Sequence, residues 1–373
     1  MHFLAALTAF LLPAACLADP NISVNPGSIK LGARLAGHLH RPPSFAVVPH
    51  NLQKVSHPFE VDVPLKVPRT KACTVNVVQH EFVFSFGKPF VGNFTPPVEK
   101  ECNGPWEMVV LEMTGSSRGR QYDRIAGLWI GGFLRTSTPE PTNAGILWKF
   151  QKDVTSYSST LTVPQTVVMD LSNLVTAELN GTYTVTVDLA FYSADAHANL
   201  DDVPDLVVPI SAGAESSAWF SLQSDSSVGA RNVTLPRNLR RAVVEVYANG
   251  QINDEFWYVN APNSYIQLLN QTGTGNGAYW RWRWSREDFV FGMLTRLSSV
   301  PTYPGPYREI LVFIDNKLAG ATVTFPVIFS GERASVMVPM LSIGALNIPS
   351  YYIDVTPFVG LLVDGKRHQI GLQ

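Results

Sequence analysis

Residues 183–191 read YTVTVDLAF, with an apolar side chain at every second position. Successive side chains of a β-strand point to opposite faces of a sheet, so this period of two predicts a strand with one buried face. Alternating or strongly apolar runs recur at residues 80–86, 106–113, 243–247, 279–284, 310–314 and 323–329. Turn residues separate them, as in Gly87-Lys88-Pro89, Asn180-Gly181, Asn249-Gly250 and Pro304-Gly305-Pro306. Many short strands divided by such turns are typical of antiparallel β-sandwiches.

Helical periodicity is scarce outside these runs. Only residues 152–161 and 170–180 could each hold a short helix. The stretch 194–205 is acidic and contains proline, which favours a boundary between two β domains. We therefore expect a proline-rich lead-in over residues 19–57, a first sandwich over 58–205 and a second over 206–373.

The composition excludes several classes of protein. The 373 residues carry a formal net charge of −2, and 46% of them are hydrophobic. A nucleic-acid-binding protein would need a basic surface to neutralise phosphates. A disordered chain would be less hydrophobic and more highly charged. A folded protein that does not bind nucleic acid is expected.

The N-terminus resembles a targeting segment. Residues 3–12 are nearly all apolar, and small residues then lead to Ala18. This pattern predicts a signal peptide over residues 1–18, although a buried core segment would share the apolar run. No other run approaches the roughly 20 apolar residues of a membrane span. We expect a secreted, extracellular or vacuolar protein that is free of the membrane after cleavage.

Two cysteines, Cys73 and Cys102, remain once the segment containing Cys16 is removed. In an oxidising compartment such a pair predicts one disulfide, the alternative being two free buried thiols. The bond would close a loop of about 30 residues and contribute about 3 kcal/mol if unstrained. Five glycosylation sequons agree with the secretory route, at Asn21, Asn93, Asn180, Asn232 and Asn270.

Common catalytic motifs do not account for the chain. There is no His-Glu-x-x-His zinc helix, Walker loop or Rossmann fingerprint, so we expect no metal and no cofactor. His38 and His40 lie in the lead-in and are read as solvated. Residues 115–119 match Gly-x-Ser-x-Gly, but a strand-like run follows where a nucleophile elbow needs a helix.

Two acidic spots lie beside bulky aromatic residues. Asp123 falls in Arg118-Gly119-Arg120-Gln121-Tyr122-Asp123-Arg124, and the second spot is Asn253-Asp254-Glu255-Phe256-Trp257-Tyr258. A salt-bridged strand end and a solvated hairpin tip would explain them structurally. A hydrolase also needs a carboxylate to activate water and a guanidinium to stabilise an oxyanion. The indoles of Trp280, Trp282 and Trp284 fit core packing or a sugar-stacking platform.

From about residue 59 onward the chain resembles the plant and fungal peptide-N-glycosidase A family, the acidic amidases that remove N-glycans. The matching blocks are ordered along the chain: Cys73 with Asn93-Phe94-Thr95-Pro96-Pro97, Gly119-Arg120-Gln121-Tyr122-Asp123-Arg124, Leu128-Trp129-Ile130-Gly131-Gly132, Glu140-Pro141-Thr142, Gly145-Ile146-Leu147-Trp148, Lys152-Asp153-Val154-Thr155, Asn253-Asp254-Glu255-Phe256-Trp257-Tyr258, Tyr307-Arg308-Glu309, Phe325-Pro326-Val327-Ile328-Phe329 and Leu361-Leu362-Val363-Asp364-Gly365-Lys366. The family is also distantly similar to bacterial peptide-N-glycosidase F.

The resemblance implies an all-β fold, with two antiparallel jelly-roll-like sandwiches packed side by side. It implies hydrolysis of the amide that joins an Asn side chain to N-acetylglucosamine, converting Asn to Asp. Asp123 and Arg124 match the aromatic-Asp-Arg sequence around the essential acid of the bacterial enzyme. Glu255 is the natural counterpart of a second acid, with Asp254 as the one-residue alternative.

A third acid of the bacterial enzyme falls near Ser172-Asn173, where this chain has no carboxylate, and Asp170 is two residues away. Substrate-binding roles are expected for Tyr122, Asp254, Trp257 and Trp129. The expected partners are N-glycopeptides or glycoproteins, bound by a monomer.

Two departures from the family bear on activity. Residues 330–335 lack the Trp of the family's Gly-rich segment. Family members also commonly extend beyond residue 373, so the second sandwich is expected to be truncated. The competing hypothesis is therefore a non-catalytic glycan-binding protein, or an inactive homologue, on the same fold.

Overall fold

The computed structural model describes residues 54–70, 72–99, 102–130, 132–195, 203–212, 219–250, 305–328 and 340–373. It also describes the short pieces 3–4, 254–255, 257–260, 278–280 and 294–296 and the single residues 198, 200, 262 and 264. The predicted signal peptide beyond residues 3–4, the lead-in to residue 53, Asn21, Asn270, Trp282 and Trp284 lie outside the described residues.

Two four-stranded antiparallel sheets form the first unit. One has the order β3 (Ala72–Phe82), β10 (Thr182–Ser193), β5 (Trp106–Arg118) and β8 (Ile146–Asp153). The other has the order β4 (Phe90–Phe94), β9 (Gln165–Leu171), β6 (Ile125–Ile130) and β7 (Gly132–Ser137). This interleaved order of eight strands is that of a jelly roll, which confirms the predicted all-β class.

The core of this unit lies between its two sheets. The alternation in residues 183–191 is confirmed, because Tyr183, Val185, Val187, Leu189 and Phe191 are each 0% exposed. Their strand, β10, is central and pairs with both β3 and β5. The apolar face of one strand thus supplies a continuous wall of the core.

Three sequence-based expectations were wrong in detail. Strand β3 ends at Phe82 rather than continuing to residue 86, because the Ser85 hydroxyl donates to Leu171 O (2.6 Å) in a turn. Residues 170–180 hold no helix, because Asn173 donates to backbone oxygens of Phe82 and Gly181 across an irregular loop. Strand β17 (Lys317–Val323) occupies the chain just before residues 324–328, which are not strand. The helical signal at 152–161 appears as short 3-10 turns, Thr155–Tyr157 and Thr160–Thr162.

The second unit contains one four-stranded sheet of order β11 (Gly229–Thr234), β20 (Arg367–Leu372), β16 (Glu309–Ile314) and β17. Strand β12 (Val243–Val246) pairs with β19 (Tyr351–Asp354), which is followed by the 3-10 turn Thr356–Phe358 and helix α2 (Val359–Leu362). Smaller pairs are β2 (Phe59–Glu60) with β18 (Met340–Leu341), β1 (Phe3–Leu4) with β13 (Asn249–Gly250), and β14 (Ala278–Trp280) with β15 (Leu294–Arg296). None of the helices among the described residues is long and apolar enough to span a membrane.

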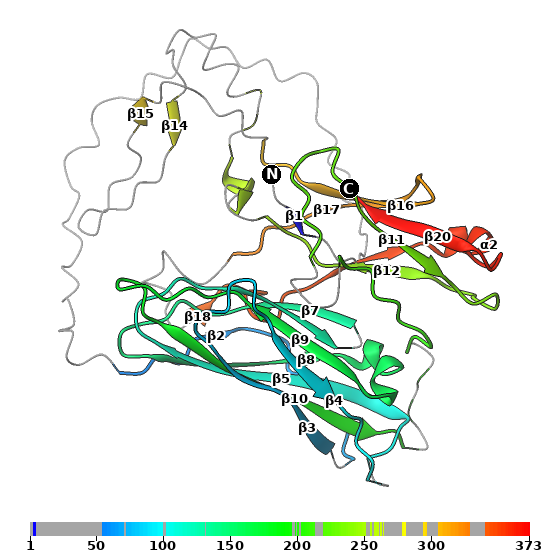
Figure 1. Ribbon diagram of the computed structural model, residues 1–373, viewed down its shortest axis with the longest axis horizontal. Coiled ribbons are helices and arrows are strands. Elements are labelled where there is room, and N and C mark those ends of the chain that lie inside the picture. Colours follow the sequence, from blue (N-terminus) through cyan, green and yellow to red (C-terminus); the bar gives the residue numbers. More distant parts are fainter. Residues whose placement is uncertain are drawn as a thin grey trace, which may run out of the picture.

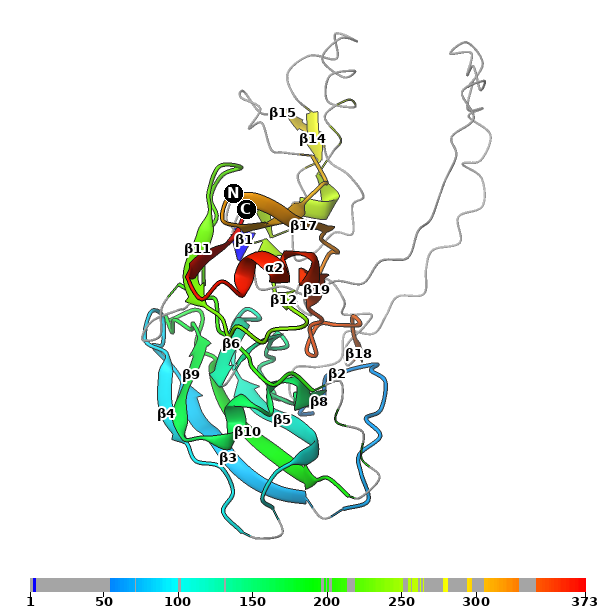
Figure 2. The same ribbon diagram turned by 90° about the vertical axis from the view of Figure 1, so that its right-hand side faces the viewer.

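The two units lie side by side in both views (Figures 1 and 2). Polar and charged side chains bridge them. Tyr157 Oη donates to Glu245 Oε2 (2.6 Å), and Lys152 Nζ donates to Ile348 O (2.8 Å). Burial lowers the pKa of Lys152 to about 8. Residues Leu341, Ala345 and Leu346, from far along the chain, join the hydrophobic core of the first unit.

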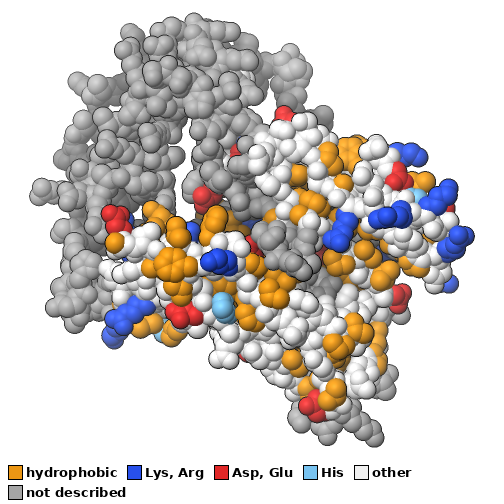
Figure 3. Space-filling view, viewed as in Figure 1, with side chains coloured by type: hydrophobic (Ala, Val, Ile, Leu, Met, Phe, Trp, Pro, Cys, Tyr) orange, Lys and Arg blue, Asp and Glu red, His pale blue; other side chains and the backbone are white. Residues whose placement is uncertain are grey.

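Basic side chains gather at the outer end of the second unit, on the right in Figure 3. The exposed ones come from β11, β20 and the two turns beside them: Arg231, Arg237, Arg240, Arg241, Lys366 and Arg367. The small net charge of the chain therefore hides an uneven distribution.

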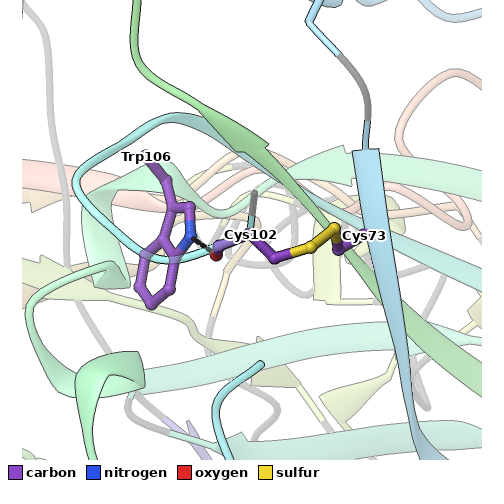
Figure 4. The surroundings of a disulfide bond; sticks show 3 residues. All are labelled: Cys73, Cys102 and Trp106. Carbon is purple, nitrogen blue, oxygen red and sulfur yellow. Dashed lines mark hydrogen bonds between the residues drawn. A yellow bond between two sulfur atoms is a disulfide. The ribbon is translucent and has the colours of Figure 1, made fainter. Parts of the chain in front are cut away.

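Cys73 on β3 and Cys102 form a disulfide with a Cα–Cα separation of 5.7 Å (Figure 4). The indole N–H of Trp106 donates to Cys102 O (2.8 Å), so the buried ring holds the second cysteine in place. The predicted pairing is confirmed, and the alternative of free thiols is wrong.

Replacing both Cys73 and Cys102 by Ser is expected to lower the free energy of unfolding by about 3 kcal/mol, because the open chain gains loop entropy when unfolded. Urea unfolding of the variant and the wild type, both without reductant, measures this difference. Reduced wild-type protein is the matched control and should unfold with the variant. An unchanged unfolding midpoint in the variant would contradict the prediction.

A histidine clamp ties β20 to two turns. The His368 side chain is buried, with Nδ1 2.7 Å from Asp315 Oδ2 and Nε2 2.9 Å from Asp364 Oδ1. Both hydrogen bonds raise the pKa of His368, and the bond to Asp315 has the larger effect. A hydrogen bond from the Lys366 N–H, and a smaller effect of the bond to His368, lower the pKa of Asp364 to about 2. The hydrogen bond to His368 also lowers the pKa of Asp315.

The clamp should stabilise the protein most between about pH 4 and pH 6.5. The imidazolium contribution is fully present below the unfolded pKa of about 6.5 and is lost as the pH rises through the raised folded value. The carboxylate contribution is present above an unfolded pKa of about 4 and is lost as the pH falls through the lowered values. The loss of unfolding free energy caused by His368→Gln should therefore be larger at pH 5 than at pH 9. The exposed His57 provides the control variant His57→Gln, and equal losses at both pH values for His368→Gln would contradict the clamp.

Candidate active site

Asp123 lies in the loop of residues 119–124 that joins β5 to β6. The loop starts at Gly119, whose φ of +112° is one that L side chains rarely adopt. A Cβ there would also lie 2.6 Å from Asn180 Oδ1, which accepts from the Arg120 N–H (2.9 Å). Glycine is thus required where the chain turns from β5 toward Asp123.

Hydrogen bonds hold the residues that flank Asp123. Arg124 Nη2 donates to Gln121 Oε1 (2.6 Å), and the Arg124 N–H donates to Thr138 Oγ1 (2.9 Å). Tyr122 is 46% exposed, whereas Asp123 and Arg124 are half-buried. The three predicted residues of this spot therefore form one ordered, solvent-facing cluster at the edge of the first sandwich.

The second spot is organised by a buried ion pair. Asp254 is 4% exposed and Arg308 3%, and Arg308 Nε donates to Asp254 Oδ2 (2.9 Å) while Nη2 donates to Oδ1. The Arg308 guanidinium also lies 5.7 Å from the centre of the Trp257 ring. Both Asp254 oxygens are thus engaged by Arg308, while the neighbouring Glu255 is half-buried.

Strand β7 connects the two spots. Arg135, on β7 and 1% exposed, donates to Ala248 O (2.7 Å) and to Asn249 Oδ1 (2.5 Å), and burial lowers its pKa to about 9. The next residue, Gly250, packs so closely that a Cβ would lie 2.1 Å from Asp254 O. Because Thr138 follows β7 directly and bonds Arg124, both acidic spots are anchored to the same strand. It remains a prediction that the carboxyl groups of Asp123 and Glu255 act on the same bound substrate.

The remaining predicted substrate contacts are differently placed. Trp129 is half-buried on β6 and meets Trp219 edge to face at 5.5 Å between ring centroids. At a strand rise of about 3.3 Å per residue, Trp129 is roughly 20 Å along the chain from Asp123. Trp129 therefore lies near the end of β6 that is remote from the Asp123 loop. Trp257 is only 7% exposed and packs against Arg308.

The position expected for a third acid holds amide and hydroxyl groups. Asn173 is buried with its amide bound to backbone oxygens, and Asp170, 8% exposed, accepts from Ser172 Oγ (3.1 Å). Within the part of the chain that the structure describes, no three His, Cys, Asp or Glu side chains are grouped to hold a metal ion.

Comparison with known proteins decides the family. The family model described as "Peptide N-acetyl-beta-D-glucosaminyl asparaginase amidase A" matches residues 60–281 and 291–373. The chain belongs to this family. A Prunus dulcis protein of the family, "Peptide-N4-(N-acetyl-beta-glucosaminyl)asparagine amidase A", is 36% identical over 333 residues, which are 84% of this chain and 53% of that protein. The chain thus spans about half the length of the curated relative it matches.

Two solved structures are also similar to this chain. A structure of PNGF-II shares 12% identity at a TM-score of 0.41, covering 82% of this chain and 61% of that one. Recombinant peptide:N-glycanase F (PNGase F) shares 14% identity at a TM-score of 0.38, covering 80% of this chain and 88% of that one.

Within the region that matches the amidase A family, the structure places further residues at the candidate site that the sequence did not single out. Gln121 within the Asp123 loop and Thr138 and Tyr183 beside it hydrogen-bond the loop. Burial is the main cause that raises the pKa of Tyr183, and the charges of Asp123 and Glu140 raise it further. The quoted blocks contain Gln121 and Glu140, so position in a matching block was an available signal for these two. Tyr183 carried no such signal, since it begins a run that reads only as core.

Proposed function

We propose that this chain hydrolyses the amide between an Asn side chain and N-acetylglucosamine in N-linked glycopeptides. The observation that carries the proposal is the amidase A family match, which runs through both acidic spots. The ordered Asp123–Arg124 pair supports it, because amide hydrolysis needs a carboxylate and a positive charge at one place.

In the proposed mechanism Asp123 orients a water molecule against the Asn side-chain carbonyl and takes its proton. The new carbon–oxygen bond produces an oxyanion, which the Arg124 guanidinium stabilises. The carbon–nitrogen bond then breaks, the nitrogen receives a proton, and Asn becomes Asp. Glu255 holds the sugar or relays that proton, and the released glycosylamine later loses ammonia.

Two of the proposed substrate-binding residues would contact the glycopeptide directly, and the other two would support the site from below. The exposed Tyr122 is suited to contact the first sugar or the peptide beside Asp123. Trp129 would stack against a remote sugar, since it is far from Asp123 along the strand. Trp257 and Asp254 act beneath the surface, by holding Arg308 and the backbone that carries Glu255.

We also propose that the protein is a secreted or vacuolar monomer that travels through the secretory pathway. The disulfide supports this route, because disulfides persist in oxidising compartments. Asn93, Asn180 and Asn232 are exposed, as glycosylation sites must be.

A glycan-binding protein without catalysis is the second candidate function. It is favoured by one observation: the position expected for a third acid holds the Ser172 hydroxyl and the Asn173 amide in place of a carboxylate.

Incubation of the purified chain with a defined N-glycopeptide in water labelled with heavy oxygen tests the proposal. The amidase would release the whole glycan and leave Asp carrying one labelled oxygen. An intact glycopeptide that binds the protein without cleavage would support the second candidate. A product with one sugar still on Asn would reveal a glycosidase and contradict the amidase.

A further inference from the structure

A buried hydroxyl lies directly beneath the Asp123 loop. Tyr183 is 0% exposed at the start of β10, and its Oη donates to the backbone oxygen of Tyr122. Burial raises the pKa of Tyr183 far above its usual value, so the hydroxyl keeps its proton and can donate this hydrogen bond. The bond fixes the peptide group between Tyr122 and Asp123.

A buried amide holds the same loop from its other side. Gln121 is 1% exposed, and its Nε2 donates to Leu174 O (3.1 Å) and to Gly181 O (3.5 Å). Its Oε1 accepts from the Tyr122 N–H (3.1 Å) and from Arg124 Nη2 (2.6 Å). The donors and the acceptor of this one side chain are therefore all engaged, and one of its bonds orients the Arg124 guanidinium.

Together these bonds restrain the backbone on both sides of Asp123. The oxygen of Tyr122 is bound by Tyr183 and its N–H by Gln121, while Thr138 bonds both the N–H and the oxygen of Arg124. The restrained segment is otherwise a solvent-facing loop with Tyr122 exposed. The three side chains that make these bonds, Gln121, Thr138 and Tyr183, are all buried in the first sandwich.

We infer that Tyr183 and Gln121 are positioning residues for the proposed amide hydrolysis, holding Asp123 and Arg124 in the geometry that the reaction needs. The inference rests on the proposed function. A carboxylate and a guanidinium stabilise a transition state only if they are already in place when charge develops. A misplacement of about 1 Å can lower the rate by about a hundredfold.

Tyr183→Phe removes only the hydroxyl and is the central test. The expected result is a kcat about ten- to a hundredfold lower with KM little changed, because the loop still binds glycopeptide but presents Asp123 less accurately. Hydrogen exchange of the peptide covering residues 119–124 should also become faster, and this readout does not depend on activity.

Thr155→Val is the matched control, because it also removes a hydroxyl bonded to the backbone. Thr155 Oγ1 accepts from the Val109 N–H (3.0 Å), and Val109 pairs with Phe191 at the opposite end of β10. This variant should lower stability while leaving kcat and the exchange of residues 119–124 unchanged.

Gln121→Glu tests whether this side chain lies close enough to the reacting carboxyl to be coupled to it electrostatically. It keeps the shape and the acceptor for Arg124, but it replaces the amide donor to Leu174 O and Gly181 O by a carboxylate two residues before Asp123. Since like charges favour the neutral form of a carboxyl, the acid limb of the kcat/KM profile should shift to higher pH.

Wild-type kcat and unchanged exchange in Tyr183→Phe would overturn the inference, as would an equal loss of kcat in Thr155→Val. An unshifted acid limb in Gln121→Glu would show that residue 121 is not coupled to the reacting carboxyl, which would overturn a positioning role for Gln121. If the wild type itself cleaves no glycopeptide, the proposed function fails. Faster exchange in Tyr183→Phe, and not in Thr155→Val, would then still support the restraint of the loop.

Discussion

Asp123→Asn should reduce glycopeptide hydrolysis at least about a thousandfold, since the neutral amide can neither take a proton from water nor balance Arg124 electrostatically. The substitution preserves shape, and the hydrogen bonds that fix the loop come from Gln121, Thr138 and Tyr183. Folding and glycopeptide affinity should therefore be retained while turnover is lost.

Initial rates measured by glycan release, together with a binding titration, separate these effects. Asp205→Asn is the matched control, because it removes a carboxylate from an exposed position far from the loop in sequence. A variant at Asp123 that retains more than about a tenth of wild-type turnover would assign the proton transfer to another group.

Asp254→Ala should have the largest effect on stability. It removes one partner of a buried pair and leaves the Arg308 guanidinium, 3% exposed, without its carboxylate. Breaking such a pair costs about 3–5 kcal/mol. Activity should fall as well, because the segment carrying Glu255 loses its anchor.

Urea unfolding with and without the substitution measures this loss. The exposed pair of Lys149 and Glu112 (2.7 Å) gives the control Glu112→Gln, which should cost less than about 1 kcal/mol. The double variant Asp254→Leu with Arg308→Met should recover much of the stability, because an apolar pair has no charge to desolvate. Equal losses for the buried and exposed pairs would show that Asp254 contributes no more than a surface contact.

The strands were predictable where one face alternates and is buried, as in β10. The jelly-roll order came from the family resemblance, since periodicity carries no information about which strands pair. The errors occurred where a distant partner decides the local structure. Ser85 ends a run of alternating phenylalanines through a bond to Leu171, and Asn173 bonds backbone on two other segments.

At the candidate site, too, local sequence patterns indicated some residues while contacts with distant residues could not be foreseen. A motif singled out Asp123 and Arg124, and the family resemblance favoured Glu255 over its neighbour Asp254; the roles of all four residues stay predictions. Arg308 distinguishes Asp254 from Glu255, because it takes both oxygens of Asp254, and it lies 54 residues away. Tyr183 acts on the backbone of a residue 61 positions distant, which no local pattern records.

The contribution of Leu341, Ala345 and Leu346 to the first core has a consequence for the order of events during biosynthesis. These residues emerge from the ribosome about 150 residues after β10 is complete, which at 5–20 residues per second is roughly 8–30 s. During this interval the nascent first sandwich exposes the part of its hydrophobic core that these three residues later cover. Chaperone engagement would be concentrated in that window, and a stop codon before residue 341 would harm the sandwich that precedes it.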